Sequence, residues 1–367
     1  MVKINTKTKR IRILFFITGL GKGGAEKQLF NLMSGLINKK NLEIKLISIF
    51  GGDYEKDFKK LGISVNVFFK NKNFNLFKSI FLFKKYVKDF KPDIVHSFLF
   101  HSNIISKFSL FFMKKNFKLI CSYRSLIKKY PLITFLEYLN QWKTDLLICN
   151  SKRALMDLKI YNFFKVKKKI VYNGFEIKKI NTKKAKEFKK KYKGKKIILT
   201  VGRFSLEKDY FTNIRTCFEL SLLRDDFLFI YVGGNDYKKY LKFAKKLKIL
   251  DKIVFLGKRD DVLELMSISK VFFLPTLYES QCNALMEAMY SKLPIVTTDL
   301  KENRELVKFA KFCKVKDYKC MAKKINEILN GSFNNNYLEK NYNYLINNFS
   351  KEKMVEKYYK IYEVLVR

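Results

Sequence analysis

The chain has 367 residues, of which 48% are hydrophobic, and its formal net charge is +43. This length suits two domains of about 150–200 residues, each with its own core, and the low glycine and proline content excludes a collagen-like or disordered protein. The lysine excess indicates either an anionic partner (nucleic acid, an acidic membrane or a phosphorylated substrate) or the bias of A/T-rich codons. Codon bias does not explain why acidic residues are so few, so we expect an anionic surface among the partners.

Cysteine and histidine argue against a metal site. None of the six cysteines forms a C-x-x-C pair and there are two histidines, so we expect no structural zinc site. Most of the cysteines lie in or beside apolar runs, as small buried residues do in a reducing cytosol. They are Cys121, Cys149, Cys217, Cys282, Cys313 and Cys320.

No part of the sequence predicts a membrane span. The apolar run over residues 13–18 is too short for a signal peptide, and charged residues follow it at once. No run approaches the roughly 20 apolar residues of a spanning helix. We therefore expect a cytoplasmic protein that is at most peripheral to a membrane.

In the first half, short apolar runs alternate with amphipathic ones. We expect strands at 11–18, 42–50, 63–69, 93–99, 118–123, 145–150 and 169–172, and helices near 24–38, 74–90, 102–113, 131–143 and 151–160. Runs such as Leu146 to Cys149 are apolar on both faces, which is typical of a parallel sheet covered by helices.

The second half repeats this rhythm. We expect strands at 195–201, 227–232, 252–256, 270–274, 293–298 and 311–315, and helices at 209–223, 236–249, 260–268, 283–291, 301–308 and 317–330. Two such series predict two doubly wound α/β domains, with a boundary after the turn Asn173-Gly174. A last helix from Ser350 to Leu365 carries an apolar stripe that needs a surface to cover it.

A glycine-rich turn, Gly19-Leu20-Gly21-Lys22-Gly23-Gly24, opens the first helix. Glycine lets a ligand approach the backbone, and a helix start favours negative charge. The spacing also satisfies the G-x-G-x-x-G of dinucleotide enzymes. However, Asp53, the first acid after the second strand, is poorly placed for that role. Dinucleotide binding and a tight turn without a ligand both stay open.

The strand at 195–201 runs into Gly202-Arg203, and Lys208 follows five residues after Arg203. This spacing puts two cations at the carboxyl edge of the sheet, where doubly wound domains bind ligands. Two fixed cations suit a diphosphate. On spacing alone, two solvated basic residues are an equally good interpretation.

The loop after the strand at 270–274 carries two glutamates eight residues apart, Glu279 in the loop and Glu287 inside the next helix. The helix start, near Gln281 to Asn283, offers free N–H groups to a phosphate or a sugar hydroxyl. Glu287 lies on an apolar stretch and would be costly to bury without a partner, and a ribose diol is a fitting one. A solvated glutamate on the outer helix face is the alternative.

With these residues the sequence resembles retaining glycosyltransferase family 4, whose members adopt the GT-B fold. Glu279 and Glu287 match its E-x7-E motif. The other matches occur in the expected order over nearly the whole chain: Gly23-Gly24-Ala25-Glu26, Gly202-Arg203 with Lys208, Val254-Phe255-Leu256-Gly257 and Leu293-Pro294-Ile295-Val296.

The resemblance implies two Rossmann-like domains that face each other across a cleft. Residues 1–173 would bind the acceptor, and residues 174–349 would bind the nucleotide sugar. The helix within 350–367 would cross back to pack on the first domain.

The resemblance also implies roles for single residues. Arg203 and Lys208 would bind the donor diphosphate and stabilise it as the leaving group, and Glu279 would contact the donor sugar. Glu287 would hold the ribose, and the donor site would further include Gln281, Cys282, Asn283, Gly23 and Gly24. Fixed cations and a helix start can neutralise the leaving group, so we expect neither a metal nor a cofactor beside the UDP-sugar. Retention would follow from front-face attack.

One motif departs from the family. Many members carry His-x-His at the end of the fourth strand, whereas this chain reads His96-Ser97-Phe98, with His101 three residues after Phe98. This stretch resembles the bacterial N-glycosylation enzymes that build oligosaccharides on a lipid diphosphate, including an N-acetylgalactosamine transferase. For His96, a role beside the acceptor and a structural role stay open.

Aromatic residues alternate with lysines in the first half, over 73–91 and 104–118. One apolar face of each helix must cover the sheet, but the pattern is wider than one stripe. We therefore expect a surface that meets anionic headgroups or a polyprenyl-linked diphosphate glycan, through Lys78, Lys84, Lys85 and Lys88, with His96 and His101 nearby.

Two other functions would each account for only one feature of the sequence. A nicotinamide oxidoreductase would explain only the first glycine loop. A basic nucleic-acid-binding protein would explain only the charge, and the lysines are scattered over both halves without a known binding module. The sequence favours a glycosyltransferase that moves an N-acetylhexosamine or hexose from a UDP-sugar to a glycan, and no nucleic acid among its partners.

Overall fold

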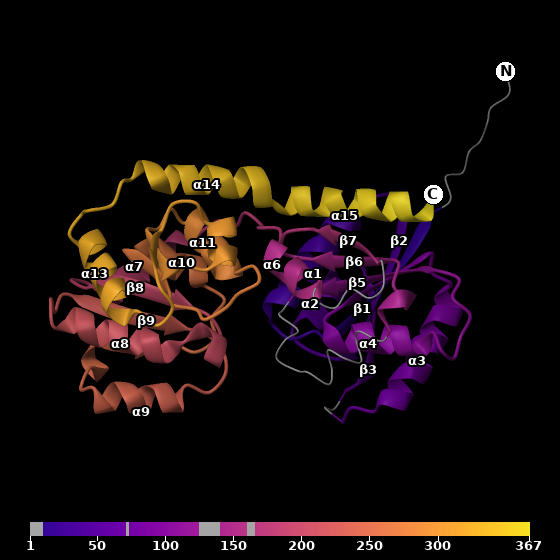
Figure 1. The fold of residues 1–367 in the computed structure, drawn as a ribbon, viewed down its shortest axis with the longest axis horizontal. Helices are drawn as coiled ribbons and strands as arrows, with labels where there is room; N and C mark the ends of the chain where they lie inside the picture. The colour runs from indigo at the N-terminus through magenta and orange to yellow at the C-terminus, as the bar shows by residue number, and fades with distance from the viewer. Residues whose placement is uncertain (1–9, 71–72, 125–139, 160–165) are drawn as a thin grey trace, which may run out of the picture. The chain divides into compact units, whose positions relative to one another are not determined.

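The computed structural model describes residues 10–70, 73–124, 140–159 and 166–367. The chain divides into two compact units (Figure 1). The first unit comprises Met1–Glu176 and Phe349–Arg367, and the second comprises Ile177–Asn348. The described helices include none that is both long and apolar enough to cross a bilayer.

The first unit is built on a seven-stranded parallel sheet with the order β3-β2-β1-β4-β5-β6-β7. Its strands are β1 (Ile11–Gly19), β2 (Leu42–Phe50), β3 (Ser64–Phe69), β4 (Ile94–Phe98), β5 (Lys118–Tyr123), β6 (Leu146–Cys149) and β7 (Lys167–Ile170). Its helices include α1 (Gly24–Leu36), α2 (Tyr54–Lys60), α3 (Leu76–Phe90), α4 (Phe100–Ser109), the 3-10 turn η2 (Gln141–Lys143), α6 (Lys152–Lys159) and α15 (Lys351–Val366).

The alternation of side chains along β1 divides the core of this unit into two layers. Ile13, Phe15 and Ile17 face the layer formed with α1, α2 and α15. Leu14 and Phe16 face the opposite layer, which contains residues of α3 and α4. Both faces of the sheet are therefore covered by helices, and α15 lies on the face opposite α3 and α4.

The second unit has a six-stranded parallel sheet with the order β10-β9-β8-β11-β12-β13. Its strands are β8 (Lys196–Val201), β9 (Phe227–Val232), β10 (Ile253–Phe255), β11 (Val271–Leu274), β12 (Ile295–Thr298) and β13 (Lys311–Cys313). Its described helices are α7 (Thr182–Lys191), η3 (Leu206–Lys208), α8 (Tyr210–Ser221), α9 (Lys238–Lys246), η4 (Leu250–Lys252), α10 (Val262–Ile268), α11 (Asn283–Tyr290), α12 (Lys301–Leu306), α13 (Tyr318–Leu329) and α14 (Asn336–Phe349).

The predicted doubly wound α/β fold is confirmed. The strand order reverses between β1 and β4 and again between β8 and β11, which gives each sheet a switch point where ligands bind in such folds. Every predicted strand has a counterpart. The helix expected over 131–143 falls largely outside the described residues, and its described end is the turn η2.

Three of the described α-helices were not predicted: α2, α7 and α14. Helix α7 has no buried residue, so its lysine-rich sequence lacks the apolar periodicity that indicates a helix. It is held on α10 and on the segment before it by polar contacts: the Asn181 N–H donates to Glu264 at 2.9 Å, and the guanidinium of Arg259, which precedes α10, lies 5.2 Å from the Phe188 ring. Helix α14 is rich in asparagine, which has a low helix propensity.

Helix α15 is part of the core of the first unit. Ser350 caps it by accepting a hydrogen bond from the Lys353 N–H, and Met354, Val355, Tyr358, Ile361 and Tyr362 are buried in the layer shared with α1. The contact with α1 is close at Gly35, where an added Cβ would lie 2.5 Å from Cγ2 of Val355.

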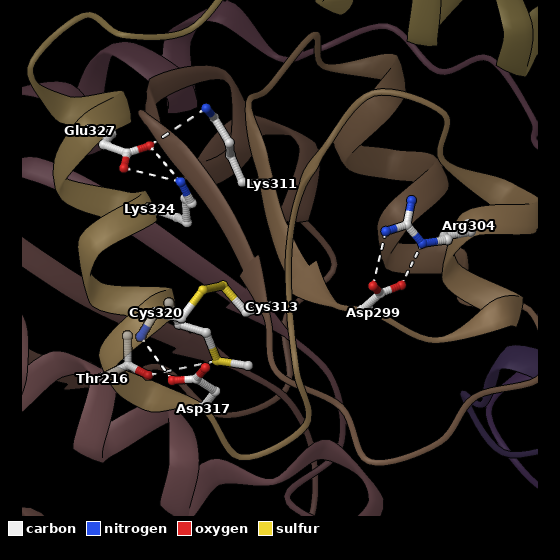
Figure 2. The surroundings of a disulfide bond; sticks show 10 residues. Thr216, Asp299, Arg304, Lys311, Cys313, Asp317, Cys320, Lys324 and Glu327 are labelled. Atoms are coloured by element: carbon white, nitrogen blue, oxygen red, sulfur yellow. Dashed lines mark hydrogen bonds and ion pairs between the residues drawn. A yellow bond between two sulfur atoms is a disulfide. The ribbon is translucent and has the colours of Figure 1, made fainter.

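Two of the six cysteines correct the expectation of unpaired buried thiols. Cys313 ends β13, Cys320 lies in the first turn of α13, and the two form a disulfide with their Cα atoms 6.1 Å apart (Figure 2). Asp317 caps α13 by accepting from the Cys320 N–H at 3.0 Å. The turn between strand and helix brings the two sulfurs together, and their spacing in the sequence does not reveal this. The other four cysteines are buried and form no disulfide.

The contact at Gly35 gives a prediction about stability. Alanine is favoured over glycine inside a helix by about 1 kcal/mol, but overpacking a stiff β-branched neighbour typically costs about 1–3 kcal/mol. We expect Gly35→Ala to lower the free energy of unfolding. In a Val355→Ala background the clash is gone, so the same substitution should raise it. Urea denaturation of the four proteins measures both effects, and equal effects in the two backgrounds would contradict the close packing.

Candidate active site

The loops that follow β8, β9 and β10 meet through their backbones at the carboxyl edge of the second sheet. The Gly202 N–H donates to the carbonyl of Val232 at 2.9 Å, and the Gly233 N–H donates to that of Gly257 at 2.9 Å. A Cβ added to Gly233 would lie 1.8 Å from the Gly202 carbonyl oxygen. Only glycine permits this approach, which fixes the loop that carries Arg203 and Lys208.

Lys208 is the charged centre of this edge. It ends the turn η3 after β8, and its ammonium forms an ion pair with Glu279, with only 14% and 13% of the two side chains exposed. Its Nζ also lies 3.7 Å from Sγ of Cys282. Burial alone would lower the pKa of Lys208, but the charge of Cys282, whose thiol ionises only in alkali, and the charge and hydrogen bond of Glu279 outweigh it, so this pKa lies above its ordinary value. Lys208 is therefore a permanent cation.

Cys282 is a neutral neighbour of this pair. Burial raises the pKa of its thiol to about 11, against the opposing charge of Lys208. The thiol is therefore protonated at neutral pH, and Glu279 supplies the negative charge beside Lys208. Cys282 is also the N-cap residue of α11, so the ion pair lies at the start of that helix.

Arg203 lies in the same loop as Lys208 but in a different environment. Its side chain is 71% exposed, and its guanidinium is 3.6 Å from a carboxylate oxygen of Glu207. The ion pair is long and its guanidinium is exposed to solvent, so it is weak. The guanidinium of Arg203 can therefore exchange Glu207 for another anion at little cost, which the buried Lys208 cannot do with Glu279.

Glu287 lies on α11, within an otherwise apolar stretch. Ala284, Leu285, Met286, Ala288 and Met289 are buried, whereas Glu287, Gln281 and Asn283 are half-buried. The structure thus gathers the predicted donor residues of the second unit on two neighbouring loops and the start of one helix. Gly23 and Gly24 belong to the first unit, where Gly23 is the N-cap of α1.

Glu302 was not predicted as a site residue, although it contacts the site directly. It is buried on α12, and its carboxylate accepts a hydrogen bond from the Glu279 N–H at 3.3 Å. Thr276, in the loop that carries Glu279, holds this loop against the loop after β8 by donating a hydrogen bond to the Glu207 carbonyl at 2.7 Å. Glu302 lies in the first turn of the helix that follows β12, which places it near the carboxyl edge of the sheet, and this was the signal in the sequence that could have identified it.

His96 of the first unit is fully buried. Its Nδ1 lies 2.7 Å from the Tyr362 hydroxyl, and its Nε2 lies 2.7 Å from the Ser122 hydroxyl. Burial, assisted by Arg124, holds the pKa of His96 well below its ordinary value. Both ring nitrogens are thus occupied, which supports the structural role and leaves no nitrogen for an acceptor. His101 is on the exposed side of α4, with its ring 6.2 Å from that of Phe74.

The environment of His96 predicts a pH dependence of stability. Below about pH 6.5 a histidine in the unfolded chain takes up a proton, whereas buried His96 stays neutral. The unfolded state then binds more protons, so the free energy of unfolding should fall as the pH falls below about 6.5. His96→Gln should flatten this slope in urea denaturation. A larger change in His101→Gln, the less buried control, would contradict the assignment.

Two family models match consecutive parts of the chain. Residues 22–179 match the model described as Glycosyltransferase Family 4. Residues 181–352 match the model described as Glycosyl transferases group 1.

Characterised relatives agree with these models. The capsular polysaccharide biosynthesis glycosyltransferase CapH of Staphylococcus aureus is 25% identical over 82% of this chain and 85% of CapH. An enzyme of Campylobacter jejuni is 31% identical over 54% of this chain and 50% of that enzyme. It is N-acetylgalactosamine-N,N'-diacetylbacillosaminyl-diphospho-undecaprenol 4-alpha-N-acetylgalactosaminyltransferase.

Solved structures show the same fold. Anabaena HepE, crystallised with UDP and glucose, superposes on 97% of the chain and 100% of HepE with a TM-score of 0.85 at 16% identity. Sucrose-phosphate synthase of Thermosynechococcus elongatus covers 97% of the chain and 99% of its own length with a TM-score of 0.82 at 17% identity. With two family models that match residues 22–179 and 181–352, and with two parallel sheets, the chain belongs to glycosyltransferase family 4 and has the GT-B fold.

Proposed function

We propose that this glycosyltransferase moves an N-acetylhexosamine or hexose from a UDP-sugar to a lipid-linked glycan, with retention of configuration. It would act in cell-surface polysaccharide, lipopolysaccharide or protein-glycan assembly, at the cytoplasmic face of a membrane. The observation that carries the donor assignment is the buried Lys208–Glu279 pair at the start of α11, with exposed Arg203 in the same loop.

These residues suit a nucleotide diphosphate for electrostatic reasons. The start of α11 favours an anion, Lys208 is a fixed cation and Arg203 can exchange its weak partner for a phosphate. Negative charge grows on the diphosphate as the sugar departs, and these groups are in place to stabilise it without reorganisation. We therefore propose that neither a metal nor a cofactor is needed. That HepE was crystallised with UDP supports a uridine nucleotide.

The Lys208–Glu279 pair also has a positioning role in this proposal. Glu279 shares the ammonium with the donor, so the ammonium stays oriented whether or not a donor is bound. The Glu279 loop is in turn held by Glu302 and Thr276. A donor sugar beside this loop would meet a preorganised carboxylate, and Glu287 further along α11 would take the ribose.

The acceptor is proposed from the relatives. The names of the Campylobacter jejuni enzyme above and of an Escherichia coli galactosyltransferase each include a sugar on diphosphoundecaprenol. We propose an acceptor of this class for the first unit, and no nucleic acid among the partners. Incubation with a panel of UDP-sugars should give slow donor hydrolysis and thermal protection. Protection by NAD instead, or salt-sensitive retention on DNA, would favour the other functions.

The two cations give a kinetic prediction. Arg203→Ala should lower kcat by roughly 10²–10³ with little change in donor affinity, because its contribution grows with the charge on the leaving group. Lys208→Ala alone leaves Glu279 buried without its partner. We therefore compare it with the double variant Lys208→Ala/Glu279→Gln, and we expect a similar fall of kcat in the single and the double variant. Lys196→Ala, at the other end of β8, is the control. A rise in KM with unchanged kcat would show that both residues bind the donor equally in the ground state and the transition state, and that they do not contribute to catalysis.

Glu287 gives a prediction about binding. Glu287→Ala should abolish the calorimetric signal of UDP-sugar binding, because a carboxylate that accepts two ribose hydroxyls cannot be replaced by a methyl group. Circular dichroism should show an intact fold. Glu219→Ala is the matched control. Glu219 is also half-buried on a helix of the second unit, but it lies near the end of α8, at the amino edge of the sheet and away from the site. Unchanged donor affinity in Glu287→Ala would refute its role.

A further inference from the structure

The first unit exposes an unusual group of aromatic side chains. Five are more than half exposed: Phe77 (80%), Phe81 (68%), Phe111 (55%), Phe112 (59%) and Trp142 (55%). They come from α3, from the turn after α4 and from η2. Single exposed apolar residues need no explanation, but several together indicate a surface that meets a partner.

Covering the sheet does not require these rings. The inner face of α3 is formed by Ile80, Phe83, Val87 and Phe90, which are buried in the core layer. Phe77 and Phe81 lie outside this buried face, on the exposed side of the helix. At helical spacing this outer stripe continues with Lys84, Lys85 and Lys88, so α3 presents two aromatic rings and then three lysines along one line.

Contacts join the three segments into one surface. The Lys84 ammonium lies 5.9 Å from the centre of the Phe112 ring, which connects α3 to the turn after α4. The Phe111 and Trp142 rings have their centres 6.5 Å apart. We call these five aromatic residues, with Lys84, Lys85 and Lys88, the aromatic–lysine patch.

A buried lysine holds two of the rings in place. The ammonium of Lys143 lies 3.2 Å from the Phe111 ring centre and 4.8 Å from that of Trp142. Such cation–π contacts are strong when desolvated. The Phe111 and Trp142 rings are therefore fixed on the outside of the unit, where they remain more than half exposed.

The charge of the patch is available for a partner. Nearby Lys115 is engaged by Asp145 at 2.5 Å, but Lys84, Lys85 and Lys88 have no ion pair within the described part of the chain. Aromatic rings beside unpaired lysines complement a surface with an apolar interior and an anionic rim. Anionic phospholipid headgroups over acyl chains have this chemistry.

We propose that the aromatic–lysine patch docks this enzyme on an anionic membrane, with the rings at the headgroup level and the lysines against lipid phosphates. The proposal deepens the proposed function, because a lipid-linked acceptor lies in such a membrane. Docking itself requires neither donor nor acceptor, so it is measured separately from transfer.

The test is cosedimentation with phosphatidylcholine vesicles that contain or lack phosphatidylglycerol, at low salt. The wild type should bind only the anionic vesicles. The triple variant Lys84→Glu/Lys85→Glu/Lys88→Glu should bind them at least about tenfold more weakly. The matched control is Lys183→Glu/Lys186→Glu/Lys190→Glu on α7, which changes the net charge equally on an exposed helix without buried residues and should retain binding.

A second pair of variants tests the rings. Phe77→Ser/Phe81→Ser should weaken binding about tenfold or more. Leu222→Ser/Leu223→Ser, whose leucines are 66% and 60% exposed in the second unit, should not. All four positions are exposed, so thermal unfolding should show intact folds.

Three results would overturn the docking proposal. The first is that the wild type does not bind anionic vesicles. The second is that the α3 and α7 triple variants lose vesicle binding equally. The third is that the patch variants change only the self-association of the protein, measured by light scattering, and not its vesicle binding. Hydrolysis of UDP-sugars, measured without vesicles in the same preparations, separates the two proposals. Vesicle binding without any donor hydrolysis would refute the proposed function and leave docking in place.

Discussion

The ion pair between Lys208 and Glu279 is the constraint around which the second unit is arranged. A buried ammonium is costly unless an anion and good geometry compensate for it, and Cys282 cannot be that anion because its thiol is protonated. Glu279 must therefore stay in place, and the loop that carries it is held by Glu302 of α12 and by Thr276. The glycines that let the loops after β8 and β9 touch fix the other partner. The polar positions at this edge of the sheet are thus determined together.

The two cations of this edge differ in how readily they can respond to a ligand. Lys208 keeps its charge and its partner, so it contributes a fixed field. Arg203 is exposed and only weakly held by Glu207, so its guanidinium can turn toward an arriving phosphate. In the empty site Lys208 is paired with Glu279 and Arg203 with Glu207, so the two cations are not left uncompensated beside each other. The site can still concentrate positive charge on a diphosphate when one binds.

Much of this organisation could be read from the sequence because it is local. Apolar runs such as that of β6 mark buried parallel strands, and a residue directly after a strand must lie at the carboxyl edge of its sheet, which located Arg203, Lys208 and Glu279. The features that were missed depend on contacts between distant segments. Glu302 acts on a backbone 23 residues away, Cys313 meets Cys320 only because a turn folds back, and the burial of His96 depends on Tyr362 of α15. Helix α7 was missed because polar contacts hold it in place of an apolar stripe.

The layers of the first unit decide how a docked enzyme would meet its lipid-linked acceptor. Helix α15 covers one face of the sheet, while α3 and α4 cover the other, so docking through the aromatic–lysine patch does not compete with α15. Because α3 follows β3 and runs back beside the strands, Phe77 and Phe81 lie near the carboxyl edge and Lys88 lies toward the amino edge. The patch therefore extends along the face of the unit, and the strands would run along the membrane surface. The carboxyl edge, where doubly wound domains bind ligands, would then open sideways at headgroup level, where the diphosphate of a polyprenyl-linked glycan lies.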